Sequence, residues 1–330
     1  MSSLRDLLSA TAAATVTMGG EAPPLAPVFE ILNAFADAGS KVAREVRRAA
    51  LSGKTGYAGG TNVTGDAQKK LDVLGNEIVL EALEKTRLVA AVVSEEDANP
   101  VRTQSPDAPY AVCTDPIDGS SNTDVDGPLG TIFSIAPRPS AGALPQGREL
   151  VAAGYVLYGP STIIALAATG IPACAYTLDE ERNAWVATHP RLRCPERGRT
   201  FSANLGRQRE WHPNLRAYLE HVTDTDKATS RPYSLRYIGA LVADLHRCLL
   251  EGGIYFYPGD PKNPDGKLRL LYECAPLAFL TESAGGRASD GTRRVLDVEA
   301  KAAHQRCPLV IGSAADVALY ERFMKTGSAT

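Results

Sequence analysis

The chain has 330 residues, of which 44% are hydrophobic and 22% charged, a composition typical of globular proteins. Its net charge of −3 argues against a general nucleic-acid-binding surface. No apolar run reaches the roughly 18 residues that a membrane-spanning helix needs, and Arg5 and Asp6 make a secretory signal unexpected. The cysteines form no CxxC pair and several stand in apolar runs, which predicts reduced, buried thiols in a cytoplasmic protein.

The N-terminal half is expected to combine helices and strands. Apolar residues at helical spacing predict two helices, over 27–51 and 69–85. The glycine-rich stretch 52–65 between them is expected to be a mobile loop. Short apolar runs predict strands over 88–93, 110–114, 130–135, 151–158 and 162–168.

A polar, arginine-rich stretch over 188–199 predicts a domain boundary, with one domain over 1–195 and a second over 196–330. Beyond it, a strand is expected to begin at Phe201 and another to cover 253–257, followed by a Pro/Gly/Asp loop. Helices are predicted over 236–249 and 268–283, the second stopped by two glycines. Strands mixed with helices throughout predict an α/β fold of two packed domains.

Seven carboxylates stand where α/β folds build ligand sites, just after strands or close to helix starts. They are Asp66, Asp72, Glu95, Glu96, Asp115, Asp118 and Glu273. Taken singly, each has a simpler interpretation as a solvated turn, a surface residue of a helix or a salt-bridge partner. The question is whether the fold brings them together.

The stretch DPIDGSSN, residues 115–122, is the most informative of these. Asp115 and Asp118 are three apart, so both carboxylates and the Ile117 carbonyl can point to one place, and Pro116 restricts the backbone. Two such carboxylates repel each other unless a cation lies between them, and oxygen ligands suit Mg²⁺ or Mn²⁺. The following Gly-Ser-Ser-Asn offers N–H groups for a phosphate. From the residues alone, a metal-dependent phosphate site and an Asp-rich structural turn both stay open.

The longer stretch DPIDGSSNTDVDGPLGTIFSI resembles the signature of class I fructose-1,6-bisphosphatases, within the lithium-sensitive, metal-dependent phosphatase superfamily. The shorter D-P-x-D-G-[ST] core is shared with inositol monophosphatases, so it does not select a substrate. Further segments resemble this family, of the bacterial type, in family order: NVTGDAQKKLDVLGN, VSEED, GYVLYGPST, RYIGALVADLHR and GGIYFYPGDPKNPDGKLRLLYECAPLAFLTESAGG. The resemblance implies a layered α-β-α-β-α sandwich of the sugar phosphatase type.

The resemblance also implies a role for each matching residue. The implied metal ligands are Glu95, Asp115, Ile117 through its carbonyl, Asp118 and Glu273. The implied catalytic residues are Asp66, a loop acid that supports the metal cluster, and the pair Asp72 and Glu96, which takes the proton from the attacking water. The implied substrate contacts are Gly119 and Ser120 for the 1-phosphate, Asn204, Tyr237, Tyr257 and Lys267 for the 6-phosphate, Arg236 donated by a neighbouring subunit, and Arg269 close to the reacting phosphate.

The implied activity is hydrolysis of the 1-phosphate of fructose 1,6-bisphosphate by a water that two or more Mg²⁺ ions activate, with Mn²⁺ as an alternative. The resemblance further implies a homotetramer in gluconeogenesis or the Calvin cycle. The net charge and the lack of a long apolar run predict no nucleic-acid or membrane partner for this cytoplasmic protein.

Several positions depart from the family pattern. The N-terminal turn that binds AMP in the animal enzymes lacks its threonines, Pro109 replaces a basic residue beside Tyr110, and an arginine is displaced by one position to Arg138. These departures argue against AMP inhibition. The linker 137–150 holds no cysteine, which predicts that the redox switch of the plastid enzymes is absent.

Other functions stay open as alternatives. Arg207 replaces a tyrosine of the 6-phosphate pocket, which admits sedoheptulose 1,7-bisphosphate as a further substrate. An inositol phosphate is a less favoured substrate. A metabolite-binding protein without catalysis is disfavoured because all seven acids are present.

Overall fold

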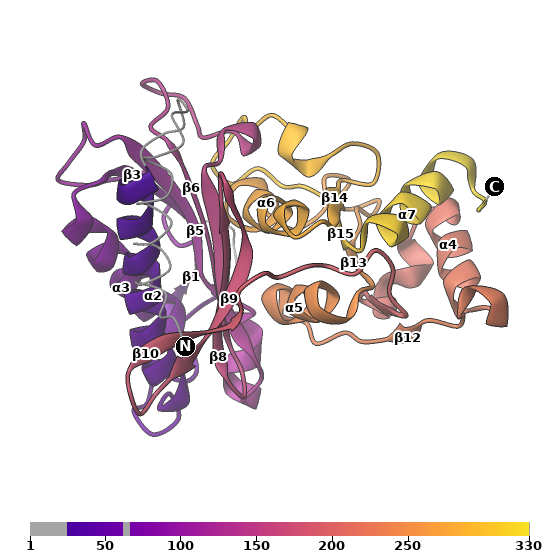
Figure 1. The fold of residues 1–330 in the computed structure, drawn as a ribbon, viewed down its shortest axis with the longest axis horizontal. Helices are drawn as coiled ribbons and strands as arrows, with labels where there is room; N and C mark the ends of the chain where they lie inside the picture. The colour runs from indigo at the N-terminus through magenta and orange to yellow at the C-terminus, as the bar shows by residue number, and fades with distance from the viewer. Residues whose placement is uncertain (1–24, 62–66, 330) are drawn as a thin grey trace.

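The structure is a computed structural model that describes residues 25–61 and 67–329. These residues form five layers, in the order helices, sheet, helices, sheet, helices (Figure 1). The predicted layered α/β sandwich is therefore confirmed.

The first layer consists of α2 (Leu25–Arg47) and α3 (Lys70–Thr86), which pack on one face of the larger sheet. The buried side of α2 carries apolar residues at helical spacing, and its Phe35 ring stacks on Phe133 of the sheet at 4.2 Å between centroids. The start of α3 is held by its own third residue, because the Asp72 carboxylate accepts the Lys69 N–H at 2.7 Å.

The larger sheet has eight strands in the order β10-β9-β8-β7-β6-β5-β3-β4. Their bounds are β3 (Val89–Ser94), β4 (Val101–Arg102), β5 (Tyr110–Asp118), β6 (Leu129–Pro137), β7 (Ala152–Tyr158), β8 (Thr162–Ala168), β9 (Ile171–Asp179) and β10 (Ala184–His189). Neighbouring strands run antiparallel except β3 and β5, which are parallel, with Ser94 opposite Thr114. The carboxyl ends of β3 and β5 consequently lie side by side.

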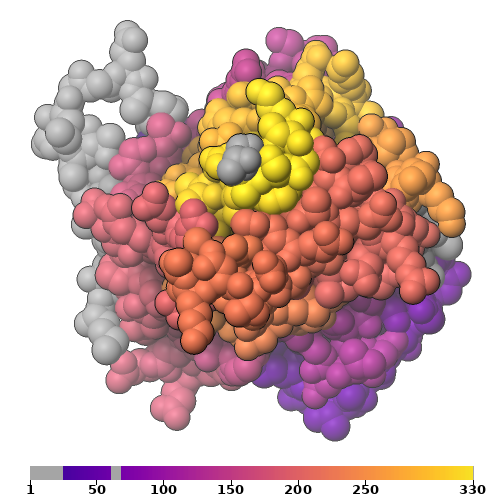
Figure 2. All heavy atoms as spheres, turned by 90° about the vertical axis from the view of Figure 1, so that its right-hand side faces the viewer, coloured from indigo at the N-terminus to yellow at the C-terminus, as the bar shows by residue number. Residues whose placement is uncertain are grey.

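The second sheet is built from the C-terminal part of the chain, in the order β12-β11-β13-β15-β14. Its strands are β11 (Thr200–Ser202), β12 (Ser234–Leu235), β13 (Ile254–Tyr257), β14 (Arg287–Ser289) and β15 (Leu309–Gly312). Both β12 and β13 run parallel to β11, so three adjacent strands end at one edge. Figure 2 shows the molecule from the side of this second sheet, where the C-terminal part of the chain, in orange to yellow, forms most of the surface.

The remaining helices fill the space between the sheets and cover the outside of the second sheet. Between the sheets lie α5 (Leu241–Glu251) and α6 (Ala275–Ser283), and outside lie α4 (Pro213–Thr223) and α7 (Ala314–Thr326). The small elements are β1 (Tyr57–Thr61), β2 (Ala67–Lys69), the 3₁₀ helices η1 (Ser120–Val125), η2 (Gly147–Glu149), η3 (Leu205–Glu210), η4 (Lys227–Thr229) and η6 (Val295–Asp297), and the π-helical turn η5 (Leu270–Cys274).

Three apolar clusters hold the layers together. One lies between the first helices and the large sheet, one between the two sheets around α5 and α6, and one under α4 and α7. All six cysteines are buried free thiols, as predicted. No helix in the described part of the chain is both long enough and apolar enough to cross a membrane.

Two predicted boundaries were wrong at positions that matter for the site. The strand predicted to end at Thr114 continues to Asp118, because its pairing with β6 resumes beyond a bulge. The helix predicted from Arg236 begins only at Leu241. Residues 236–240 do not have helical backbone geometry, and Gly239 among them has a φ of +84°.

Other elements were missed or assigned to the wrong class. The predicted loop 52–65 contains β1, which pairs with β2 to form a small hairpin. No prediction covered β9, β10, α4, β14, β15 or α7. Several of these are short strands or half-polar helices whose partners come from distant parts of the chain, so local periodicity is weak.

Candidate active site

The parallel pairing of β3 and β5 brings the first two acids together. Glu95 is the first residue after β3, and its N–H donates to the Thr114 carbonyl at 3.2 Å. Asp115 follows Thr114 directly, so the two carboxyl groups lie next to each other, close enough for each to shift the pKa of the other. Burial is the main cause that raises the pKa of Glu95 to about 7.

The bulge in β5 aims Asp118 at the same place. Pairing with β6 shifts between Asp115 and Asp118, and the intervening Ile117 N–H turns back to the Asp115 carboxylate at 3.0 Å. The first turn of α5 then holds Asp118, because its carboxylate accepts the N–H groups of Leu241 at 3.3 Å and Val242 at 2.8 Å. A helix N-terminus favours a negative charge at this position.

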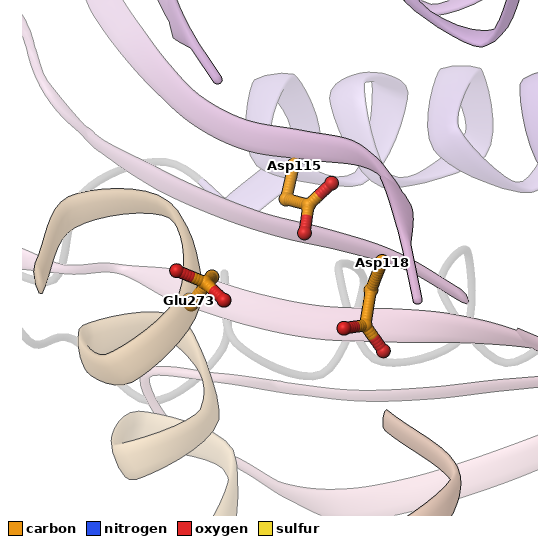
Figure 3. A group of neighbouring side chains, drawn as sticks. All are labelled: Asp115, Asp118 and Glu273. Carbon is orange, nitrogen blue, oxygen red and sulfur yellow. The ribbon is translucent and has the colours of Figure 1, made fainter. Parts of the chain in front are cut away.

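Glu273 comes from the far side, out of the π-helical turn that precedes α6. Its carboxylate accepts the Arg269 N–H, which fixes the side chain. Pro276 stands in the first turn of α6, where no N–H donor is needed. Figure 3 shows Asp115, Asp118 and Glu273 facing a common space, and one oxygen of each lies within 4.8 Å of the others.

These three carboxyl groups are buried together without an ion-pair partner among the described residues. Asp115, Asp118 and Glu273 are 2%, 6% and 8% exposed, and no described lysine or arginine makes an ion pair with any of them. Burial raises the pKa of all three, to about 6 for Asp118 and well above the ordinary range for the other two. Converging buried oxygens without a cationic partner fit a hard divalent cation.

The candidate base Asp72 lies beside this cluster. Its Oδ2 accepts the Lys69 N–H, while its buried Oδ1 has no partner among the described residues. Burial, and to a smaller extent the nearby charge of Glu96, raise the pKa of Asp72 to about 7. Glu96 itself accepts a hydrogen bond from the Gln68 side chain. Asp66 lies outside the described residues, so its predicted role remains a prediction.

The turn after Asp118 is shaped by Gly119. Its φ is +76°, and a Cβ there would lie 2.7 Å from the Cβ of Ala240, so only glycine fits. Ser120 then begins η1, and its hydroxyl lies close enough to Asp72 to lower the pKa of that carboxyl. The predicted 1-phosphate residues therefore adjoin the predicted base.

A second group gathers at the edge of the smaller sheet. Because β12, β11 and β13 are parallel neighbours, the residues at their carboxyl ends share one edge. These are Asn204 two residues beyond β11, Arg236 and Tyr237 directly beyond β12, and Tyr257 at the end of β13. Lys267 lies close to the same edge. Gly266, the residue before it, packs on Pro308, and Leu309, the residue after Pro308, pairs with Tyr257.

The comparisons with known proteins agree with this arrangement. The family described as "Fructose-1-6-bisphosphatase, N-terminal domain" matches residues 17–190, and its C-terminal domain matches residues 194–325. The chain belongs to the class 1 fructose-1,6-bisphosphatase family. A class 1 fructose-1,6-bisphosphatase of Acaryochloris marina is 50% identical over 307 residues, which cover 91% of this chain and 92% of the relative. One of Chlorobaculum tepidum is 43% identical over 90% and 91%.

Solved structures give the same result. The crystal structure of Leishmania major fructose-1,6-bisphosphatase in holo form superposes with a TM-score of 0.89, covering 98% of this chain and 99% of that one at 32% identity. The layered fold is thus that of the fructose-1,6-bisphosphatase family.

In this member of the fructose-1,6-bisphosphatase family, a short segment joins the two groups of residues. Residues 236–240 run from the end of β12 to the helix turn that holds Asp118. Asp244, which no prediction singled out, fixes this segment by accepting the N–H groups of Ile238 and Gly239, each at 3.0 Å. It also accepts the Ser202 hydroxyl at 2.7 Å. An acid within an otherwise apolar helix start was the available signal.

The family departures can also be located. Tyr110 is buried in the cluster under the first helices, whereas residues Met18–Pro23, which correspond to the AMP-binding turn of the animal enzymes, lie outside the described residues. Arg207 does not stand free, because its guanidinium lies 3.4 Å from Glu210 and 3.7 Å from Asp260. Arg269 is 8% exposed and donates to the His304 carbonyl at 3.0 Å.

Asp124, a further acid of the family signature, links the β1–β2 hairpin to η1, which follows the turn at Gly119. Its carboxylate pairs with the Lys69 ammonium and accepts the Gly56 N–H at 2.8 Å. The same ammonium lies 3.9 Å from the centre of the Tyr57 ring. The stretch SSNTDVDG contained this acid, but its position gave no reason to single it out.

The Asp124→Asn variant is expected to loosen this hairpin, because the neutral amide loses the ion pair with Lys69. Amide hydrogen exchange in β1 should become about two- to fivefold faster, and kcat should fall by a similar factor. Exchange in β5 serves as the internal reference. Asp126→Asn is the matched control, since Asp126 is exposed two residues further on; equal effects of both variants would contradict a specific tie.

Proposed function

We propose that the chain hydrolyses the 1-phosphate of fructose 1,6-bisphosphate to fructose 6-phosphate and inorganic phosphate. The observation that carries this proposal is the pairing of two sites. A buried triad of carboxylates adjoins the Gly119 turn, and the edge formed by Asn204, Tyr237 and Tyr257 is linked to it through residues 236–240. One site suits a reacting phosphate and the other a second phosphate on the same small molecule.

Asp115, Asp118 and Glu273 would hold divalent cations, with Glu95 and the Ile117 carbonyl as further ligands. We propose Mg²⁺, with Mn²⁺ as the alternative, and two or more ions in each subunit. When bound, such ions lower the pKa of a water molecule and offset negative charge on the phosphate.

The chain's own residues would orient the substrate and accept a proton. Asp72, with a pKa of about 7 and one unpartnered oxygen, can take up a proton near neutral pH, and Glu96 is its neighbour in this role. Gly119 and Ser120 would hold the reacting phosphate, with Arg269 nearby and Asp66 supporting the site. The 6-phosphate residues would contribute binding energy that fixes the orientation of the 1-phosphate.

The direct test measures phosphate release by the purified chain with Mg²⁺ from three substrates. These are fructose 1,6-bisphosphate, sedoheptulose 1,7-bisphosphate and inositol monophosphate. We expect the highest kcat/KM for fructose 1,6-bisphosphate and no phosphate release from inositol monophosphate. Absence of phosphate release from both bisphosphates would overturn the proposal, and comparable values on the two would favour a bifunctional enzyme in which Arg207 broadens the pocket.

We further propose a homotetramer in which Arg236 serves the 6-phosphate site of a neighbouring subunit. Arg236 is exposed, and the apolar neighbours Leu235, Tyr237 and Ile238 are 41%, 38% and 41% exposed. Exposed apolar side chains around a functional cation are typical of a covered interface. A monomer by light scattering would contradict this.

The division into domains over 1–195 and 196–330 is likewise a proposal. It is supported by the two sheets, since each draws its strands from one side of this boundary. Cytoplasmic location and a role in gluconeogenesis or the Calvin cycle are proposed from the family alone.

Lys267→Ala is expected to raise KM for fructose 1,6-bisphosphate by about 10- to 100-fold with a smaller change in kcat. The reason is that Lys267 would lose a charge-assisted contact with the distal phosphate, far from the reacting bond. Lys262→Ala, an exposed lysine of the same loop, is the control and should leave both constants unchanged. An unchanged KM in the first variant would remove Lys267 from the site.

A further inference from the structure

A cavity of about 720 Å³ opens at the β3–β4 edge of the large sheet, away from the candidate active site. Its floor includes Ala91 and Val93 of β3 and Ala111 of β5. Its walls are the loop over 138–145 and the segment over 301–303, which comes from the C-terminal part of the chain. None of the predicted site residues lines it, and its volume is that of a small-molecule site.

The lining has a definite chemistry. The floor and walls are made mainly of alanine, proline and glycine, so the space is apolar and no large side chain fills it. The rim carries three cations, Arg102, Arg138 and Lys301, against one acid, Asp107. Arg102 has no hydrogen-bond or ion-pair partner among the described residues. Arg138 lies 3.3 Å from Asp107 and Lys301 lies 3.6 Å from Glu299, both in exposed pairs worth little.

Arg138 reaches this rim because of its register relative to β6. Successive residues of β6 face opposite sides of the sheet: Ile135 belongs to the cluster under the first helices and Ala136 to the cluster between the sheets. Arg138 continues on the side of Ala136 and lines the cavity. A shift of one residue therefore moves a cation from one face to the other.

We propose that this cavity is a second ligand site, for a small organic anion that has an apolar body and one acidic group. The apolar body would occupy the space over Ala91 and Ala111. The acidic group would reach the unpaired guanidinium of Arg102 and the neighbouring cations, Arg138 and Lys301. Arginine recognises carboxylate, sulfonate and phosphate groups in the same way, so the shared chemistry is a planar or tetrahedral oxyanion.

The cavity is connected to the proposed metal site by three short stretches. Val93 precedes Glu95 by two residues, and Ala111 lies on the strand that carries Asp115. Ala303 precedes His304, whose ring nitrogens lie 2.8 Å from the Tyr272 hydroxyl and 3.1 Å from the Asp97 carbonyl. Tyr272 is the neighbour of Glu273. A ligand that orders these walls would change the site's response to metal, a coupling that rests on the proposed function.

The binding test uses 8-anilinonaphthalene-1-sulfonate as probe, because it joins an aromatic body to one anionic group and fluoresces when its surroundings become apolar. Titration of the full chain should show one saturable site. Arg102→Glu should weaken binding by about tenfold or more, and Ala91→Trp, which fills the floor, should abolish it. Lys325→Glu is the matched control, an exposed lysine on α7 with no ion-pair partner among the described residues, and should bind as the parent does.

The contribution of the acidic group is tested with N-phenyl-1-naphthylamine, the same body without the sulfonate. The parent should bind this uncharged probe about tenfold more weakly than the sulfonate. The affinity of the uncharged probe should be the same for the parent and for Arg102→Glu. Equal binding of both probes, or normal probe binding by Ala91→Trp with an unchanged Tm, would overturn the site.

The coupling is tested separately, by the Mg²⁺ concentration that gives half-maximal phosphate release with and without saturating probe. We expect a shift of at least about twofold in the parent and none in Ala91→Trp. An unchanged midpoint would refute the coupling. Because the activity is first measured without any probe, the proposed hydrolysis would not be affected by that result.

Discussion

Asp118→Asn is expected to lower kcat by at least about 100-fold while leaving the metal-free fold as stable as that of the parent. Asparagine has nearly the shape of aspartate, and its amide oxygen can still accept an N–H group from Leu241 or Val242 at the start of α5. What it removes is one of the converging negative charges. The variant thus separates the charge of Asp118 from its role as a helix cap.

The metal-free stability follows from the same geometry. Asp118 is 6% exposed and stands in the group that also holds Asp115 and Glu273, so its ionised form is disfavoured without a cation. Neutralising it relieves repulsion and offsets the weaker cap, whose loss alone costs about 1 kcal/mol. The Tm of the variant in chelator should therefore stay within a few degrees of the parent.

Mg²⁺ titration of the Tm makes the test decisive. The parent should gain stability with increasing Mg²⁺, since a ligand that binds only the folded state raises the Tm. Asp118→Asn should need at least tenfold more Mg²⁺ for the same gain, as expected for the loss of about 1.4 kcal/mol of binding free energy. Asp126→Asn, an exposed acid of the same signature, is the control. Equal Mg²⁺ responses of all three proteins would exclude Asp118 as a metal ligand.

Features of this site that depend on residues close together in the sequence could be predicted. Features that depend on pairing between distant segments could not. Glu95 and Asp115 follow apolar runs directly, and the carboxyl ends of neighbouring parallel strands form ligand sites in α/β folds. Local patterns therefore predicted only that these acids stand where such folds build sites, and the family resemblance was needed to predict that they converge. The spacing of three predicted Asp118 beside Asp115, but not the bulge that keeps Asp118 in β5, because that bulge depends on pairing with β6.

The second site could not be derived from local patterns. β12 has two residues and β11 has three, too short for any periodicity to be recognised. Their parallel pairing, which gathers Asn204, Tyr237 and Tyr257, joins segments more than 20 residues apart. Only the family resemblance placed these residues together. Asp244 was missed for the same reason, because its partners Ser202 and Gly239 belong to different segments.

The stability of the metal-free chain is expected to fall as pH rises from 6.5 to 8. The carboxyls of Asp115 and Glu273 have pKa values raised well above the ordinary range, and those of Glu95 and Asp72 are raised to about 7, in each case chiefly by burial. The unfolded chain has lost these protons by pH 6.5, so the folded state binds more protons and stability must decrease with pH.

Other groups with shifted pKa values contribute less than these acids to the pH dependence between 6.5 and 8. His221 and His246 have lowered pKa values, so they favour the folded state increasingly as pH rises, an effect that levels off about one pH unit above their unfolded pKa near 6.5. Buried thiols with raised pKa values, such as Cys113 and Cys248, act in the same direction as the carboxyls, but mainly near and above pH 8, where thiols of the unfolded chain ionise. Each carboxyl that stays protonated in the folded state lowers the free energy of unfolding by about 2 kcal/mol between pH 6.5 and pH 8.

We therefore expect the Tm in chelator to fall by roughly 5–10 °C between pH 6.5 and 8, as measured by scanning calorimetry. Saturating Mg²⁺ should remove most of this slope, because cations bind the ionised carboxylates and make burial of their charge favourable. The Tm gain from Mg²⁺ should accordingly be larger at pH 8 than at pH 6.5. A metal-free Tm that stays level or rises across this window would mean that the acids ionise without penalty, and the cluster would then have no electrostatic need for a cation.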